Sequence, residues 1–346
     1  MGANRRQFLW AAGAIGASFV IPGLAKADAV IMEQHPLRDL FEELGATPEM
    51  LAEPRKIGVP HRYVHASLVH DHKTGQVLFE ENADVPLHPA STIKPASACF
   101  YFIFEQMGLL EELNRWDRRR LEQDVRKALI VSDNDSAARI GEVLTGLDSM
   151  KDFCRRNGIA AGTQWAFGAL FFDPLTRALG MNNTHIRNTS GLPGYYTKTP
   201  HNVTTLRDQA KFFDFALRRH PEILDITVEP FLDGPGSKPN TNRILETAQG
   251  PYDRGPGPMP TEGVDGLKTG YTKFAKYNLT TTALRNNDRI ISQVTGRDEL
   301  KDRFVDSIKL IEQGFHDLER NKKPKIKAQD NCRPADQFAH DPCPHV

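Results

Sequence analysis

The stretch Pro89-Ala90-Ser91-Thr92-Ile93-Lys94 places a serine hydroxyl and a lysine amine three positions apart at the expected start of a helix. Residues three apart on a helix share one face, so Ser91 and Lys94 lie about one turn from each other. A helix start also leaves backbone N–H groups unpaired and carries a partial positive charge, which suits an oxyanion. The stretch is therefore a candidate nucleophile with its base.

Lys94 can accept the proton of Ser91 near pH 7 only if its amine is neutral there. Its pKa must then fall from about 10.4 to about 7, which costs roughly 4 to 5 kcal/mol. The following turns carry Ala98, Phe102 and Ile103 on an apolar side and are expected to be buried. A second cation close by would supply part of the shift.

Two later motifs complete the candidate site. Lys268-Thr269-Gly270 offers that second cation on an expected strand, which continues to Tyr271 and contains a glycine where a substrate backbone could approach. Ser132-Asp133-Asn134 supplies a hydroxyl able to relay a proton and an amide able to bind a substrate peptide group. Another Lys-Thr-Gly at 73–75 precedes the serine and is explained by a hairpin turn.

Each motif also has an ordinary structural interpretation. Ser91 could be a helix N-cap, Ser132-Asp133-Asn134 a turn that ends a helix, and Lys268-Thr269-Gly270 a solvated strand start. Joint occurrence in this order favours the catalytic interpretation over the three separate ones. His70-Asp71-His72 could suggest a metal site, but adjacent residues at a strand end point in alternating directions, which predicts a surface position.

The hydrophobic pattern predicts a mixed fold. One hairpin is expected at 63–80 and another at 277–295, with helical segments between them and a last helix at about 300–318. Residues 230–263 are rich in glycine and proline and are expected to be mostly loop. Strand pairs at both ends around a helical centre indicate one α/β (α+β) domain whose sheet is closed by hairpins distant in sequence.

Charge and composition narrow the function classes. The chain has 44 basic and 44 acidic residues in 346, and 39% of its residues are hydrophobic. Zero net charge disfavours a protein that binds nucleic acid through phosphates. The apolar content supports a sizeable core and excludes disorder throughout the chain.

The N-terminus resembles an export signal of the twin-arginine type. Arg5-Arg6 precede a weakly apolar run at 10–24, and small residues at 25–29 offer cleavage sites. The run is too short for a membrane span, which needs about 18 apolar residues. An amphipathic or buried N-terminal helix is the alternative.

Export would place the chain in an oxidising compartment. A disulfide between Cys332 and Cys343, in the Pro-containing tail, is therefore predicted. Cys99 and Cys154 lie among apolar or mixed helical residues and are expected to pack in the core. A zinc site in the tail lacks a recognisable spacing among its candidate ligands, Cys332, His340, Cys343 and His345.

The three motifs in this chain order resemble those of the serine penicillin-recognising enzymes, which carry Ser-x-x-Lys, Ser-x-Asn and Lys-Thr-Gly elements. Within that superfamily the chain is most similar to the low-molecular-mass D-alanyl-D-alanine carboxypeptidases. The similarity covers about residues 62–318. It is carried by the hairpin and nucleophile helix at 63–94, the middle segment at 180–192 and the closing strands at 266–296.

This resemblance implies a β-lactamase/transpeptidase-like fold, an antiparallel sheet flanked by helices with an all-helical subdomain. The chain then divides into a signal peptide at 1–29, an N-terminal helix and linker at 30–61, a catalytic domain at 62–318 and a basic, Pro- and Cys-containing tail at 319–346. A periplasmic protein with no evident membrane anchor is expected.

The resemblance also implies acyl transfer without a metal or cofactor. The expected partners are peptidoglycan stem peptides ending in D-Ala-D-Ala, with β-lactams as covalent inhibitors and no nucleic acid. Lys94 would deprotonate Ser91, and the N–H groups of Ser91 and Tyr271 would hold the oxyanion. Ser132 would transfer a proton to the leaving amine, and Asn134 would bind a substrate amide. Lys268 and Thr269 would bind the terminal carboxylate. The substrate backbone would pair with residues 268–272, which include Gly270, as an added strand.

Alternatives remain within the same superfamily. The motifs do not separate removal of a terminal D-alanine from cleavage of a D-amino-acid cross-link by a D,D-endopeptidase. The segment from Ser91 to Ser132 is shorter than the family pattern and the one from Ser132 to Lys268 is longer, so a peptidoglycan- or β-lactam-binding scaffold with little turnover is a further alternative. A class A β-lactamase is disfavoured because no glutamate occurs between Glu142 and Glu222.

Overall fold

The computed structural model describes residues 35–47, 57–58, 60–194, 201–247 and 260–322. The expected export signal, part of the N-terminal linker, the Cys332–Cys343 pair and most of the tail lie outside these residues. No helix in the described ranges is long and apolar enough to cross a membrane.

Five antiparallel strands form one sheet, with the Lys268 strand at its edge. The strand order is β2-β1-β5-β4-β3. Both predicted hairpins are confirmed, and β1 pairs with β5 in the register Ala66↔Thr295, so segments distant in sequence close the sheet as expected. The strands are β1 (Ala66–Asp71), β2 (Val77–Glu81), β3 (Val264–Thr272), β4 (Lys276–Arg285) and β5 (Asp288–Arg297).

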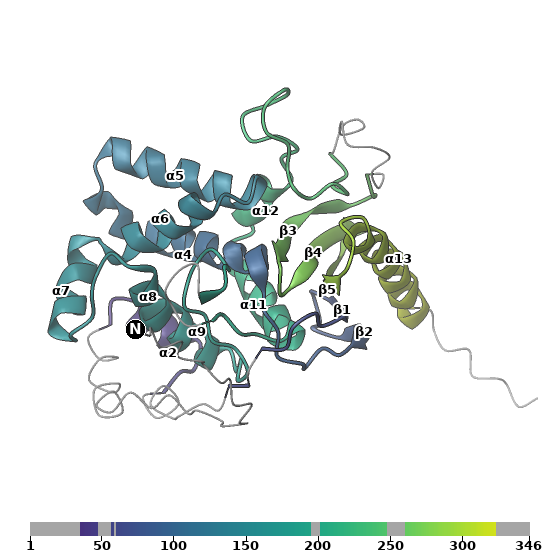
Figure 1. Cartoon of the computed structure of the whole chain (residues 1–346), viewed down its shortest axis with the longest axis horizontal. Coiled ribbons are helices and arrows are strands. Elements are labelled where there is room, and N and C mark those ends of the chain that lie inside the picture. Colours follow the sequence, from purple (N-terminus) through teal and green to yellow (C-terminus); the bar gives the residue numbers. More distant parts are fainter. Residues whose placement is uncertain (1–34, 48–56, 59, 195–200, 248–259, 323–346) are drawn as a thin grey trace, which may run out of the picture.

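Helices cover both faces of the sheet (Figure 1). Helix α13 (Asp302–Lys322) packs against one face, and α11 (Leu206–Arg219) contacts β1 from the other, beside a block of further helices. The remaining helices are α2 (Arg38–Glu43), α4 (Lys94–Gln106), η2 (Leu109–Glu112), α5 (Arg115–Ile130), α6 (Asn134–Thr145), α7 (Asp148–Arg156), α8 (Gln164–Phe167), the π-helix η3 (Gly168–Phe172), α9 (Asp173–Ala178) and α12 (Glu222–Thr227).

The hydrophobic core follows this layering. Neighbouring residues of a strand point to opposite faces, and in β1 Leu68 packs with Leu206 of α11 while Val69 packs with Phe304 of α13. A larger cluster fills the helical block around α4, most of whose residues are buried. Its aromatic members include Phe100, Phe104, Phe167, Phe171 and Phe172. Because α4 begins at Lys94, this packing also takes the lysine out of water.

The nucleophile segment differs from the helix start that the sequence predicts. Residues 90–93 form the 3-10 turn η1 (Ala90–Ile93), and the α-helix begins only at Lys94, with Pro95 in its first turn. Proline is tolerated there because the first helical N–H groups have no acceptor within the helix. Ser91 is therefore held in a tight turn that precedes the helix.

The predicted surface position of His70-Asp71-His72 is wrong. His70 is 1% exposed, and His70 Nε2 and His72 Nδ1 both contact Asp214 Oδ1, at 3.1 and 2.7 Å. Residues two apart in an extended chain face the same way, so both rings meet the carboxylate on α11. Within the described residues, no group of three or more His, Cys, Asp or Glu side chains could hold a metal ion.

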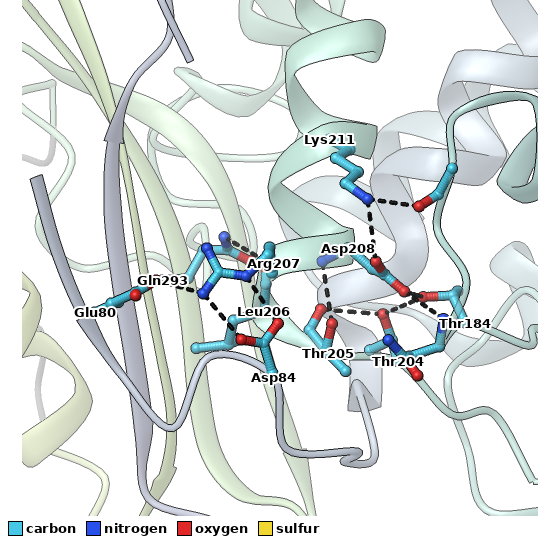
Figure 2. Close-up of polar contacts among 12 residues, drawn as sticks. Glu80, Asp84, Thr184, Thr204, Thr205, Leu206, Arg207, Asp208, Lys211 and Gln293 are labelled. Atoms are coloured by element: carbon cyan, nitrogen blue, oxygen red, sulfur yellow. Dashed lines mark hydrogen bonds and ion pairs between the residues drawn. The ribbon is translucent and has the colours of Figure 1, made fainter. Parts of the chain in front are cut away.

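A polar network fixes the start of α11 (Figure 2). Asp208, which is 3% exposed, accepts hydrogen bonds from Asn183 N at 2.8 Å and from Thr184 Oγ1 at 2.9 Å. Thr205 caps the helix by accepting from Asp208 N at 3.1 Å. On the solvent side, Arg207 pairs with Asp84 at 2.8 Å. The network joins α11 to the middle segment and to the loop after β2.

Replacing Asp208 with asparagine should lower the free energy of unfolding by about 1 to 3 kcal/mol, because an amide oxygen accepts more weakly than a carboxylate oxygen from the two buried donors. Asp84→Asn is the matched control, since this side chain is 64% exposed and its ion pair contributes less than about 1 kcal/mol. Urea unfolding followed by circular dichroism measures both. A loss for Asp208→Asn no larger than that for Asp84→Asn contradicts a structural role of the buried carboxylate.

Candidate active site

Ser91 is seated by a segment distant in sequence. Its hydroxyl donates to Ser190 O at 3.4 Å, and the residue is 8% exposed. Gly191, with φ +79°, approaches so closely that a Cβ there would lie 1.9 Å from Ala90 O. Ala90 has φ 50°, which is uncommon for a residue with a side chain. Residues 189–191 therefore hold the nucleophile turn, a role for which no local sequence pattern gave a signal.

Strand β3 closes the other side of this turn. At Gly270 a Cβ would lie 3.1 Å from Ala90 Cβ and 3.2 Å from Ser91 N, so the glycine permits the close approach that the sequence suggested. In the described sheet β3 is a terminal strand, which leaves its outer edge without a neighbouring strand. Tyr271 is 53% exposed, and its ring centroid lies 4.5 Å from that of Tyr277.

The amine of Lys94 is completely buried against the Ser132-Asp133-Asn134 turn. Nζ donates to Ser132 O at 2.7 Å and to Asn134 Oδ1 at 2.8 Å, with longer contacts of 3.3 Å to Ser132 Oγ and Asp133 O. Burial lowers the pKa of Lys94 to about 7, against the opposing effect of the Asp133 carboxylate. The amine is thus available in its neutral form near pH 7, which the sequence argument required.

The turn that holds Lys94 joins two helices. Helix α5 ends at Ile130 and α6 begins at Asn134. Ser132 has φ 62°, and Asp133 caps α6 by accepting from Ser136 N at 2.7 Å. The turn is therefore both a connection between helices and the source of the contacts to the lysine.

Lys268 is a second buried amine, so it is not a solvated strand start. It is 1% exposed, and Nζ donates to Thr269 O at 2.8 Å and to Thr269 Oγ1 at 3.4 Å. Its pKa lies well below the ordinary lysine value, first because of burial and then because of repulsion by Lys94 and Arg303.

The predicted repulsion between Lys94 and Lys268 is present in the structure. It lowers the pKa of Lys268, while burial is the largest cause that lowers the pKa of Lys94. Because repulsion between two like charges is mutual, it disfavours a proton on both amines at once.

Two residues outside the motifs support β3. Arg303, 6% exposed, donates from Nη1 to Gly270 O at 3.2 Å and to Asn278 O at 3.4 Å. Burial lowers its pKa to about 10, and repulsion by Arg243 acts in the same direction. Asn278 Nδ2 in turn donates to Pro89 O at 3.4 Å, just before the nucleophile turn. Sequence reasoning missed Arg303 and Asn278 because neither belongs to a local pattern.

The structure gathers the predicted site residues where η1, the 132–134 turn and β3 meet. Lys94 contacts the turn directly, β3 packs against Ser91 at Gly270, and Lys268 contacts Thr269. Tyr271 lies at the exposed end of the strand. This arrangement offers a hydroxyl nucleophile, a buried amine, a second hydroxyl in contact with that amine, and two further buried basic side chains, Lys268 and Arg303, beside an open strand edge. Such a set suits acyl transfer on a substrate that carries an anionic group.

Comparisons with known proteins point to one group. Residues 158–299 match the family model described as D-alanyl-D-alanine carboxypeptidase. The chain is 28% identical over 277 residues to D-alanyl-D-alanine carboxypeptidase DacA of Escherichia coli (strain K12), a match that covers 76% of this chain and 63% of that protein. It is 24% identical over 271 residues to D-alanyl-D-alanine carboxypeptidase DacF of Bacillus subtilis (strain 168), covering 71% and 60%. The chain thus spans less than two thirds of the length of these relatives.

Solved structures of penicillin-binding proteins share the fold. Penicillin-Binding Protein D2 from Listeria monocytogenes, in the ampicillin-bound form, superposes with a TM-score of 0.55 at 24% identity, covering 75% of this chain and 99% of that one. Penicillin binding protein 6B from Escherichia coli gives a TM-score of 0.53 at 21% identity, covering 75% and 78%. The predicted β-lactamase/transpeptidase-like α+β fold is confirmed.

The predicted similarity to the D-alanyl-D-alanine carboxypeptidases is likewise confirmed, by the family model and by the curated relatives. The family match includes Lys268-Thr269-Gly270 but begins at residue 158, beyond Ser91 and the 132–134 turn. The assignment of those two motifs to the site therefore depends on the geometry around Lys94.

Gly191→Ala should lower the free energy of unfolding by about 3 kcal/mol or more, because the clash with Ala90 O adds overpacking to the strain of a left-handed backbone. Gly158→Ala is the matched control. Gly158 has φ +67° but nothing within 4 Å of the added carbon, so strain alone acts and the loss should be about 1 to 2 kcal/mol.

Urea unfolding of the two variants beside wild type measures the difference. Equal losses for Gly191→Ala and Gly158→Ala would show that residues 189–191 do not hold the nucleophile turn in the way that the structure describes.

Proposed function

We propose that the protein is a serine D,D-carboxypeptidase that removes the terminal D-alanine from peptidoglycan stem peptides ending in D-Ala-D-Ala. The observation that carries the proposal is the buried Lys94 amine, whose pKa is lowered to about 7 and which contacts Ser132 and Asn134. The named activity of the curated relatives supports the choice of substrate.

Acylation begins with Ser91 and Lys94. The neutral amine takes the hydroxyl proton while Ser91 Oγ forms a bond to the carbonyl carbon between the two D-alanines. The N–H groups of Ser91 and Tyr271 donate to the resulting oxyanion. As the C–N bond breaks, the proton on Lys94 passes through Ser132 Oγ, 3.3 Å away, to the leaving amine of D-alanine. Water then hydrolyses the ester and restores the Ser91 hydroxyl.

Lys268 and Thr269 bind the terminal carboxylate. An anion at hydrogen-bond distance favours the charged form of an amine, so it opposes the burial that holds the pKa of Lys268 low. Carboxylate binding therefore stabilises the protonated form of Lys268. Arg303, a buried cation on the Gly270 carbonyl, adds to the positive potential at this end of the site.

Two further contacts orient the substrate. Asn134 Oδ1 accepts from Lys94, which leaves the Nδ2 group of the same side chain to donate to a substrate amide. The open edge of β3 binds the peptide backbone as an added strand along residues 268–272. The scissile carbonyl is thereby held beside Ser91, because Gly270 keeps β3 close to the nucleophile turn.

We assign the catalytic domain to residues 62–318 and the reaction to the periplasm, reached through a twin-arginine signal at 1–29. The linker at 30–61 precedes this domain and a tail at 319–346 follows it. β-Lactams act as covalent inhibitors at Ser91. A D,D-endopeptidase and a scaffold with little turnover would use the same residues, so the reaction products separate them from the carboxypeptidase.

The test is D-alanine release from an N-acylated D-Ala-D-Ala peptide, together with the intact mass of the protein after exposure to benzylpenicillin. Wild type should release D-alanine and gain the mass of one penicillin. Ser91→Ala should show neither, because the attacking oxygen is gone. Ser97→Ala is the matched control, since Ser97 is a buried serine on the adjoining helix α4, and it should retain both properties.

The remaining outcomes decide between the alternatives. An adduct without D-alanine release points to the scaffold or the endopeptidase. Cleavage of a cross-linked peptide dimer into two monomers without free D-alanine identifies the endopeptidase. An adduct on Ser91→Ala would remove Ser91 from the mechanism, and an unreactive wild-type protein would overturn the proposed function.

A further inference from the structure

A short segment braces β3 against the end of the helical block. Asn240 Nδ2 donates to Thr227 O at 3.0 Å and to Glu229 O at 2.9 Å, at and beyond the end of α12. Asn242 Nδ2 donates to Gly266 O in β3 at 2.9 Å. Both asparagines are at most 3% exposed. The 240–242 strut, as we name these residues, therefore has its two ends fixed by buried hydrogen bonds.

Thr241, at the centre of the strut, joins two of the site motifs. Its backbone N–H donates to Ile130 O at 3.0 Å, and Ile130 lies two residues before Ser132. On the other side, the hydroxyl of Thr269 donates to Thr241 Oγ1 at 2.7 Å. Thr241 Oγ1 in turn donates to Ile130 O over a longer distance of 3.4 Å. One side chain thus links the Lys-Thr-Gly strand to the helix that leads into the Ser-Asp-Asn turn.

The direction of these bonds matters for an anionic ligand. A hydroxyl has a single proton, and in the free protein the proton of Thr269 is directed at Thr241 while its oxygen faces Lys268 Nζ at 3.4 Å. A carboxylate accepts hydrogen bonds and donates none. Thr269 can therefore contribute a hydrogen bond to a carboxylate only after its proton turns away from Thr241.

Thr241 is able to reverse its bond with Thr269. Its own hydroxyl donates over a long distance to Ile130 O. When the hydroxyl turns away, Ile130 O still accepts a hydrogen bond from the Thr241 backbone N–H. The reversed chain runs from Thr241 to Thr269 to the carboxylate, and hydrogen bonds in such a chain strengthen one another. The 2.7 Å spacing between the two oxygens serves either direction.

We propose that Thr241 is a positioning residue that tunes the site for substrates with a free terminal carboxylate, by supporting the Thr269 hydroxyl as a donor. The inference rests on the proposed carboxypeptidase function and adds a determinant of its specificity. Thr241 acts through Thr269 and does not touch the reacting atoms. A valine at 241 keeps the shape and the backbone bond to Ile130 but removes the hydroxyl.

The experiment compares wild type, Thr241→Val and Thr241→Ser on an N-acylated D-Ala-D-Ala peptide and on the same peptide with its C-terminus amidated. Thr241→Val loses a neutral bond from Thr269 in the free protein and, in the complex, a bond to Thr269 that the carboxylate strengthens. It should therefore raise KM for the acid by about twofold to threefold and leave kcat unchanged. KM for the amide should stay unchanged, because a neutral acceptor gives little such strengthening. Thr241→Ser should restore the acid KM. Thermal unfolding verifies that each variant is folded, and Thr241→Ala replaces the valine variant if that one is not.

The inference is overturned by an equal loss on acid and amide, by a loss confined to kcat, or by failure of Thr241→Ser to restore the acid KM. The wild-type activity on the acid tests the proposed function separately. An inactive wild-type protein rejects that function and this inference with it, whereas an active wild type with an unchanged Thr241→Val acid KM rejects the inference alone.

Discussion

The removal of the Lys94 amine from water is the constraint on which the site depends. A lysine in water holds its proton far above neutral pH and cannot act as a base there. Here the packing of α4 at the centre of the helical block buries the side chain completely and lowers its pKa to about 7. The Ser132-Asp133-Asn134 turn then fixes the amine through its backbone and side-chain oxygens. The packing of the hydrophobic core therefore also sets the pKa of the lysine on which the proposed reaction depends.

The nucleophile is positioned by contacts from parts of the chain that are far apart in sequence. Gly191 contacts one side of η1, and Gly270 of β3 contacts the other. Strand β3 is itself supported by hydrogen bonds from Arg303 and from the 240–242 strut, and Asn278 joins the neighbouring strand to Pro89. The three motifs carry the reacting groups, while residues without any motif set the distances between them.

The sequence predicted those elements whose signals are local. The hairpin at 277–295 was found by its alternating pattern and turn residues, and it is present as β4 and β5. The helix start was misplaced because the 3-10 turn at Ser91 is imposed by Gly191 and Gly270, which no local pattern connects to it. His70 was placed at the surface because its partner Asp214 lies on a helix distant in sequence. Thr241 and Arg303 were missed for the same reason.

The protonation of Lys94 in the folded protein is the most direct measurement of this mechanism. A carbon–proton correlation spectrum of protein with isotopically labelled lysine, assigned with Lys94→Arg and Lys268→Arg, follows the ε-methylene group of Lys94 from pH 5 to 11. A midpoint near 7 is expected, with the amine charged below it and neutral above it. A midpoint near the ordinary lysine value of about 10.4 would show that the amine is charged at neutral pH, and Lys94 could not then be the base for Ser91.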